Sequence, residues 1–336
     1  MKGNTDILVS ICCITYNQIS SIRQCIDGFL MQKTNFKYEI IIHDDCSTDG
    51  TTEVIREYAN NYPNVIVPIF QTVNQYQNGN KRILASFVYP KVNGKYIALC
   101  EGDDYWTDSM KLQRQVDYLE THPICTMTCN RTRLFSEKQN KYVGEQYCRA
   151  SDGELSAEDI INRTGLYIPT CSIIYRKEIS DNIPDYWKEC AVGDYPLQIM
   201  CAMKGSVYYF DDVMSVYRIE NTSSWMGKQK WGSVSIERLK VIYSRVLMLN
   251  GFGSDYPYFR KVFERKVADE INRNIPYWRS SYKDKKIYLD YFSNEIKNYD
   301  LRCKLEYRLF ILRLPLIRRI YTNLFLKKYQ QLKIMY

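Results

Sequence analysis

The stretch Gly94–Trp106, GKYIALCEGDDYW, decides the fold, because in it an apolar run leads directly into acids. Lys95–Cys100 has the length and composition of a short buried strand, and Gly102 permits a turn after it. Three acids surround that glycine: Glu101, Asp103 and Asp104. Open α/β sheets bind ligands at the carboxyl ends of such strands, where carboxylates can hold a divalent cation together with phosphate. A solvated acidic turn is the alternative, which the adjoining Tyr105 and Trp106 make less favourable.

The composition is that of a folded globular protein. The chain has 336 residues, 45% of them hydrophobic and 25% charged, which suffices for one large or two ordinary domains. No stretch approaches the ~20 apolar residues of a membrane-spanning helix, and the N-terminus has neither a basic region nor a small-residue cleavage site. We therefore expect a cytoplasmic protein whose first apolar run is a strand and not a signal peptide.

The cysteines and histidines argue against two kinds of site. The 12 cysteines form no CxxC pair, and several lie in apolar, strand-like runs. This pattern indicates buried, reduced thiols and not a disulfide framework or a zinc site. Only two histidines are present, which excludes a histidine-rich metal centre.

Strands and helices alternate along the first 106 residues. Helical spacing at 20–31 and 51–62 separates apolar runs that predict strands at Ile7–Ile14, Glu39–Ile42 and Val65–Phe70. A short helix is predicted at Ile83–Val88, before the opening stretch. This alternation predicts a mostly parallel α/β sheet. The second strand ends in Asp44 and Asp45, so these acids and the acid cluster are expected at the same edge of the sheet.

The second half of the chain is less regular. Helices are predicted at Asp108–Glu120 and Gly193–Lys204, and the spacing beyond about Lys228 is helical. Strands are predicted at Ile124–Phe135, Ile168–Tyr175, Ser206–Phe210 and Met214–Ile219. The stretch Ser136–Gly153 is predicted to be a polar connection without a strand.

Three elements, in this order and spacing, resemble the inverting glycosyltransferases of family 2, which have the glycosyltransferase-A fold. They are the strand ending in TYN at 15–17, the strand followed by DDCSTDGT at 44–51, and the opening stretch. The resemblance covers Ile7 to Trp225. It implies transfer of a sugar from a nucleotide-diphosphate donor, usually UDP, to an acceptor hydroxyl with the help of Mn²⁺ or Mg²⁺. It also implies a catalytic domain at 1–228, in which 1–106 bind the nucleotide and 107–228 the acceptor, followed by a helical region at 229–300.

The resemblance assigns roles to residues of the nucleotide-binding half. The loop along the base and ribose would comprise Ile14, Thr15, Tyr16 and Asn17. Asp45, with Asp44 beside it, would accept a hydrogen bond from the uracil ring, although both acids can equally cap the next helix. Lys81 or Arg82 would meet the diphosphate. Glu101, where the family has an aspartate, and the adjoining Gly102 would lie along the nucleotide, with Glu101 reaching the ribose or a metal-bound water.

The resemblance also assigns the metal and the general base. Asp103 would be the leading metal ligand and Asp104 would support it, so that the ion takes up charge developing on the leaving UDP. Asp194 would be the base that removes the acceptor's proton. A helix N-cap is the alternative for Asp194. Many relatives have a histidine where this chain has Glu220, for which a metal contact, an acceptor contact and a surface position all stay open.

The basic excess lies in the tail. Residues 301–336 contain nine Lys or Arg and one acid, which accounts for the whole formal charge of +8. Such a segment can lie on an anionic membrane at the cytoplasmic face of the inner membrane, or pack as a helical cap on protein. Its aromatic residues do not form a platform for nucleic acid. Trp225 can line an acceptor pocket or belong to the core.

Two alternative functions share parts of this pattern. A sugar nucleotidyltransferase would have the same sheet and acids, but it would normally show a glycine-rich basic loop where this chain has Ile14–Asn17. A non-catalytic nucleotide-sugar-binding protein would keep the fold without needing the base. The sequence does not identify the sugar, the acceptor, the linkage or the oligomeric state. We expect this selectivity to lie in Ser136–Gly153 and Ile168–Cys171.

Overall fold

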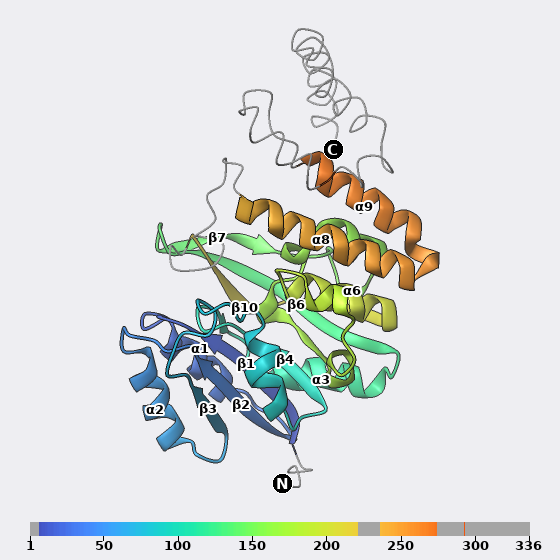
Figure 1. Cartoon of the computed structure of the whole chain (residues 1–336). Helices are drawn as coiled ribbons and strands as arrows, with labels where there is room; N and C mark the ends of the chain where they lie inside the picture. The colour runs from blue at the N-terminus through green and yellow to red at the C-terminus, as the bar shows by residue number, and fades with distance from the viewer. Residues whose placement is uncertain (1–6, 221–235, 274–291, 293–336) are drawn as a thin grey trace. The chain divides into compact units, whose positions relative to one another are not determined.

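The computed structural model describes residues 7–220, 236–273 and 292. These residues form two compact units. The first contains residues 7–188 and 192–220, and the second contains 189–191, 236–273 and 292. Figure 1 shows both units and their elements. Trp225 and the basic tail 301–336 lie outside the described residues. Among the described residues, no helix is long and apolar enough to cross a membrane.

The first unit is built on one sheet of ten strands. Its main order is β3-β2-β1-β4-β9-β6-β10-β5, with β7 paired to β6 and β8 paired to β10. The strands are β1 (Ile7–Thr15), β2 (Lys37–Asp44), β3 (Ile66–Phe70), β4 (Tyr96–Leu99), β5 (Tyr105–Trp106), β6 (Cys125–Ser136), β7 (Lys141–Gln146), β8 (Gly153–Leu155), β9 (Ile174–Arg176) and β10 (Ser206–Ile219).

Most of the long strands run in parallel. β1 pairs in parallel with β2 and β4, and β6 pairs in parallel with β10. β9 is antiparallel to both β4 and β6, so that these two strands point the same way. The carboxyl ends of β1, β2, β4, β6 and β10 therefore share one edge of the sheet, where ligands bind in folds of this kind.

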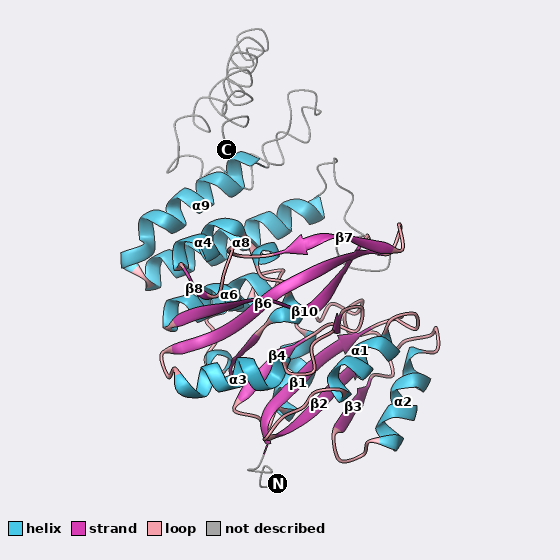
Figure 2. Ribbon diagram, turned by 180° about the vertical axis from the view of Figure 1, so that it is seen from behind, coloured by secondary structure: helices cyan, strands magenta, loops and turns pink. Residues whose placement is uncertain are grey.

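Helices cover the sheet. One face packs its alternate residues, such as Ile11, Ile40 and Ala98, against the apolar sides of α1, α2 and α3. Figure 2 shows these three helices on that side. The α-helices of this unit are α1 (Ile22–Leu30), α2 (Thr51–Asn61), α3 (Lys111–Thr121), α4 (Ala157–Arg163), α5 (Asp185–Lys188) and α6 (Asp194–Lys204). Shorter turns are the π-helical η1 (Leu84–Val88) and the 3₁₀ turns η2 (Tyr89–Lys91), η3 (Gly165–Tyr167), η4 (Thr170–Ser172) and η5 (Lys177–Ser180).

Three predictions for the second half are wrong in detail. In the apolar run Ile168–Tyr175 only Ile174 and Tyr175 belong to a strand, β9. The turn η4 precedes them, and Lys111 Nζ and Gln115 Nε2 both donate to the carbonyl of its last residue, Ser172. The two short strands predicted within 206–219 are one bulged strand, β10. The polar stretch 136–153 contains β7, which extends the sheet from β6.

The second unit is helical, as expected. α8 (Ile236–Asp255) and α9 (Arg260–Arg273) are joined by the 3₁₀ turn η6 (Pro257–Phe259), and Phe252 stacks on Phe263. The buried ammonium of Lys266 lies 3.1 Å from Glu270, which also bonds Arg245 at 2.7 Å. Across both units, the described cysteines are all free thiols and most are buried, in agreement with the reading of the sequence.

Candidate active site

The acid loop begins where β4 ends and passes close to the end of β1. The amide of Gly102 donates to the carbonyl of Ile14 at 3.0 Å, and the hydroxyl of Ser21 donates to the carbonyl of Gly102, also at 3.0 Å. A Cβ added at Gly102 would lie 2.9 Å from Thr15 Cβ and against the amide oxygen of Gln18. The glycine is therefore required for the close approach of the two loops.

Arg218, near the end of β10, holds the acid loop in place. Its backbone amide donates to Asp104 Oδ1 at 2.8 Å, and its guanidinium donates to the carbonyl of Asp103 at 2.5 Å. The same buried guanidinium contacts Glu137 at 2.7 Å and donates to the side chain of Gln24. No local pattern in the sequence indicates this role, because Arg218 lies 114 residues from Asp104 along the chain.

The carboxylates of the loop are gathered in a poorly solvated place. Burial raises the pKa of Glu101 to about 8, and the charges of Asp103 and Asp194 add to the shift. Burial also raises the pKa of Asp103, an effect that Arg218 opposes, and it raises the pKa of Asp104 well above its usual range. The structure thus brings Asp194 into electrostatic contact with Glu101, some ninety positions earlier in the chain.

Asp194 is the first residue of α6, and its carboxylate rests on Gly165. Its Oδ1 accepts the amide of Tyr195 at 2.8 Å, but the N-cap residue of α6 is Gly193 and no side chain caps this helix, so the capping alternative is not realised. A Cβ at Gly165 would lie 2.7 Å from Asp194 Oδ2. Thr164, just before this glycine, has φ of +73°, which β-branched residues rarely adopt. Gln198, one turn further along α6, donates to the carbonyl of Gly165 at 3.1 Å and fixes the turn.

The predicted nucleotide loops are joined by hydrogen bonds. The amide of Asn17 donates to the hydroxyl of Ser47 at 2.9 Å, and Asn17 Oδ1 accepts the amide of Thr48 at 2.8 Å. The amide of Gln18 donates to Thr51 Oγ1 at 2.9 Å. Asn17 has φ of +53°, a left-handed conformation that asparagine tolerates. The TYN loop is therefore preformed against the segment after β2.

Asp44 and Asp45 each have structural partners. Asp44 accepts the hydroxyls of Ser47 and Thr52, the latter at 2.5 Å, and so fixes the turn into α2. Asp45 accepts two backbone amides from the loop after β3, that of Gln75 at 2.8 Å and that of Tyr76 at 3.0 Å. Asp45 thus positions the loop that continues to Lys81 and Arg82.

Lys81 and Arg82 differ in their surroundings. Lys81 Nζ donates to the carbonyl of Tyr76 at 2.7 Å and lies 3.6 Å from the centre of the Tyr76 ring. The half-buried guanidinium of Arg82 makes no hydrogen bond or ion pair to any of the residues that the structure describes. Of the two predicted diphosphate ligands, Arg82 is the one whose charged group makes no hydrogen bond within the part of the chain that the structure describes.

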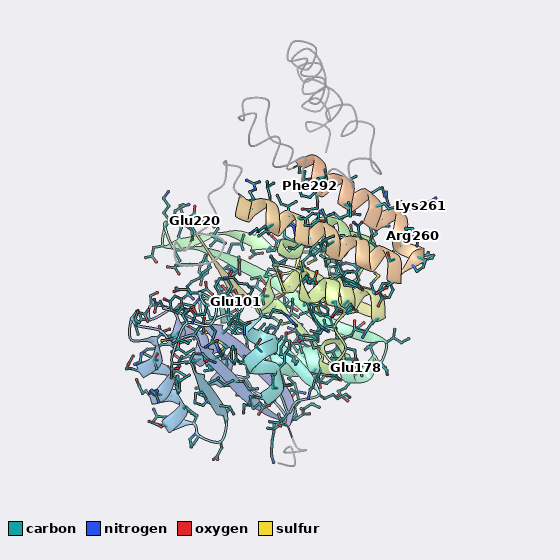
Figure 3. All side chains as sticks on the ribbon, in the orientation of Figure 1. Glu101, Glu178, Glu220, Arg260, Lys261 and Phe292 are labelled. Carbon is teal, nitrogen blue, oxygen red and sulfur yellow. The ribbon has the colours of Figure 1, made fainter. Side chains whose placement is uncertain are left out.

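Glu220 serves the hairpin between β6 and β7. Its carboxylate accepts the hydroxyl of Ser136, which also accepts the amide of Gln139 at 3.0 Å. Figure 3 shows Glu220 at the end of β10, apart from Glu101. Its backbone has φ of +60°. Of the three roles that the sequence left open, the geometry favours a structural one at the surface.

The acid loop fits a metal ion that is shared with a diphosphate. Within residues 7–220, 236–273 and 292, no three His, Cys, Asp or Glu side chains are arranged to hold a metal. Mg²⁺ in phosphate sites, however, usually takes only one or two protein carboxylates and completes its shell with phosphate and water. The raised pKa values of Glu101, Asp103 and Asp104 reflect burial and crowding that a cation would relieve.

The model for glycosyl transferase family 2 matches residues 10–183, which is more than half of the chain. The chain belongs to glycosyltransferase family 2. This glycosyltransferase is 37% identical over 222 residues to an uncharacterized protein of Mycobacterium tuberculosis, a match that covers 65% of this chain and 60% of the relative. It is 33% identical over 176 residues to a UDP-Glc:alpha-D-GlcNAc-diphosphoundecaprenol beta-1,3-glucosyltransferase of Escherichia coli, covering 52% of this chain and 61% of that one. The chain thus spans about three fifths of these relatives' length.

Solved structures confirm the expected glycosyltransferase-A fold. The crystal structure of S. aureus TarS 1-349 in complex with UDP-GlcNAc matches with a TM-score of 0.63 at 14% identity. That match covers 88% of this glycosyltransferase and 83% of the TarS chain. Two more glycosyltransferases that match in fold are recorded in complex with Mn²⁺.

Proposed function

We propose that this glycosyltransferase transfers a sugar from a UDP-sugar to an acceptor hydroxyl with inversion, in the synthesis of a surface polysaccharide or glycolipid. The names of two matched proteins support this assignment, since the E. coli relative uses UDP-Glc and a lipid-linked acceptor, and TarS binds UDP-GlcNAc. The observation that carries the proposal is the electrostatic contact of Glu101 with both Asp103 and Asp194. This contact supports the proposal that the metal ligand and the base belong to one site.

Asp194 acts as the general base in this proposal. The acceptor oxygen attacks C1 of the donor sugar from the face opposite UDP, its proton passes to an oxygen of Asp194, and the bond from C1 to the diphosphate breaks. Asp194 is half-buried and is fixed by the amide of Tyr195 and by Gly165, so its carboxylate is held in one orientation. Such fixed geometry favours proton transfer in the transition state.

The nucleotide lies along Ile14–Asn17 in this proposal. Asp45 accepts one backbone amide on each carboxylate oxygen, and the remaining lone pairs are available to the uracil NH. Arg82 binds the diphosphate. Asp103, supported by Asp104, would hold Mn²⁺ or Mg²⁺, which would stabilise the charge on the departing UDP.

A thermal-shift screen of nucleotide sugars with Mn²⁺ tests the donor assignment. We expect a UDP-sugar to raise the unfolding temperature and the corresponding GDP- and CDP-sugars to leave it unchanged, since binding to the folded state alone stabilises it. If no UDP compound raised the unfolding temperature, the proposed function would be refuted.

The substitution Asp194→Asn tests the base. We expect kcat to fall by about 10²–10⁴-fold while UDP still raises the unfolding temperature, because the base contributes to the transition state and not to nucleotide binding. Asp185→Asn is the matched control, since its side chain is 86% exposed on α5. Transfer by Asp194→Asn at the wild-type rate would remove Asp194 from the mechanism.

A further inference from the structure

Both ends of strand β7 are hydrogen-bonded to segments that adjoin the proposed catalytic groups. Near its start, the hydroxyl of Tyr142 lies 3.0 Å from that of Tyr105, which directly follows the acid Asp104. Just beyond its end, Cys148 and Tyr167 exchange two hydrogen bonds, of 3.1 Å and 3.4 Å. Tyr167 closes the turn η3, which begins at the glycine under Asp194. β7 therefore extends from the acid loop to the turn that supports the base.

This strand is also an exposed one. Its residues lie at the surface, and it pairs with β6 alone among the strands that the structure describes, which leaves its second edge unpaired. Three large apolar side chains are exposed within six positions: Tyr142 at 49%, Val143 at 40% and Tyr147 at 57%. Exposed apolar groups concentrated in this way beside a site indicate a binding surface.

The two tyrosines are held by arginines. The guanidinium carbon of Arg133 lies 5.1 Å from the centre of the Tyr142 ring, and that of Arg131 lies 5.5 Å from the Tyr147 ring. Glu145 lies between the arginines, 3.2 Å from Arg131 and 3.8 Å from Arg133. The rings are therefore fixed before any ligand arrives, which lowers the entropic cost of binding.

The charges of this surface select the class of ligand. Arg131 also pairs with Asp211 at 2.6 Å, so two carboxylates, those of Glu145 and Asp211, contact its guanidinium and offset its charge. A surface for nucleic acid or anionic lipid would leave its basic groups unpaired. A neutral saccharide, by contrast, offers C–H faces to aromatic rings and hydroxyl groups to paired charged side chains.

We propose that β7, with Tyr142 and Tyr147, is a subsite for the acceptor saccharide. It binds the sugar units beyond the one whose hydroxyl reacts, and so selects oligosaccharide acceptors over single sugars. The proposal rests on the proposed transferase function, because it takes the acid loop and Asp194 as the two sides of the reacting centre.

Binding of the full-length protein to an array of neutral oligosaccharides, one to six sugars long and without donor, tests the subsite. We expect the wild type to bind members of three or more sugars more tightly than their single-sugar counterparts. Tyr147→Ala should weaken this binding about tenfold, whereas Tyr147→Phe, which keeps the ring, should stay within about twofold. Tyr62→Ala is the matched control, a tyrosine 44% exposed at the end of α2.

Two results would overturn the subsite. One is the absence of any saccharide whose binding depends on Tyr147. The other is loss of self-association in Tyr147→Ala by sedimentation with no change on the array, which would make this surface an interface between copies. Because the array needs neither donor nor turnover, its failure leaves the donor screen standing. Failure of the donor screen, in turn, refutes the transferase function independently of the array.

Discussion

The substitution Gly165→Ala places one methyl group against the proposed base. The added Cβ would lie 2.7 Å from Asp194 Oδ2 and 3.0 Å from its Cγ. Gly165 is not among the glycines with positive φ, so alanine fits the backbone there without strain. The perturbation therefore acts on the carboxylate and leaves the fold otherwise intact.

The size of the effect follows from that distance. An ordinary contact begins at 3.4 Å, so Asp194 Oδ2 at 2.7 Å must move by about 0.7 Å. A misplacement of about 1 Å in a catalytic group can cost about a hundredfold in rate. We expect kcat to fall about 10–100-fold, the donor KM to stay within about twofold, and the unfolding free energy to change by less than about 1 kcal/mol.

Steady-state transfer assays and urea unfolding measure these quantities. Gly193→Ala is the control. Gly193 directly precedes Asp194, but a Cβ added there would meet nothing within 4 Å. In the Asp194→Asn background, Gly165→Ala should cause no further loss, because its effect passes through the carboxylate. An additive loss in the double variant would refute the reasoning.

Three further predictions concern stability. Arg218→Met leaves Glu137 and the carbonyl of Asp103 without their partner. Since Glu137 is 36% exposed and can be solvated, urea unfolding should show a loss of about 1–3 kcal/mol; no measurable loss would contradict the role given to Arg218. Burial lowers the pKa of Lys111 to about 8, so the unfolded chain binds more protons between pH 8 and about 10.5 and stability rises with pH there. Urea midpoints at pH 7.5 and 9.5 should show this gain in the wild type relative to Lys111→Met, and parallel profiles would count against it. Burial also lowers the pKa of His43, so stability should fall as the pH drops below about 6.5. Thermal unfolding should show a smaller fall in His43→Gln. The same dependence of unfolding temperature on pH in both proteins would disprove this.

The periodicity of the sequence predicted the strands and helices of the first 106 residues well. The runs Ile7–Ile14 and Lys95–Cys100 contain most of β1 and all of β4, whose mostly buried residues are apolar because a parallel strand covered on both faces has no solvent-exposed side. Their fixed direction then placed Asp45 and Asp103 at one edge before any contact was known. The role proposed for Asp194 came from the resemblance alone, since an aspartate at a helix start otherwise indicates a cap.

Contacts between distant parts of the chain could not be predicted in this way. The role of Arg218 depends on the acid loop, which is far from it in the sequence. The role of Gly165 depends on Asp194, a residue of α6 that comes much later in the chain. β7 was missed because its residues are exposed on both faces, so they lack the alternation that marks a half-buried strand. In each case the information lies in a long-range pair and not in a local pattern.

The end of β10 connects two parts of the site mechanically. Arg218 bonds the acid loop, and Glu220, two residues later, bonds Ser136 at the turn of the β6–β7 hairpin. A displacement of the hairpin is therefore transmitted to the acid loop through a few residues of one strand. Thermodynamic linkage then requires reciprocity. If a ligand on the hairpin alters the affinity of the acid loop for its own ligand, the acid-loop ligand alters the affinity of the hairpin for its ligand by the same factor. In that case, binding of the donor and binding of the acceptor would each change the affinity for the other before any chemistry takes place.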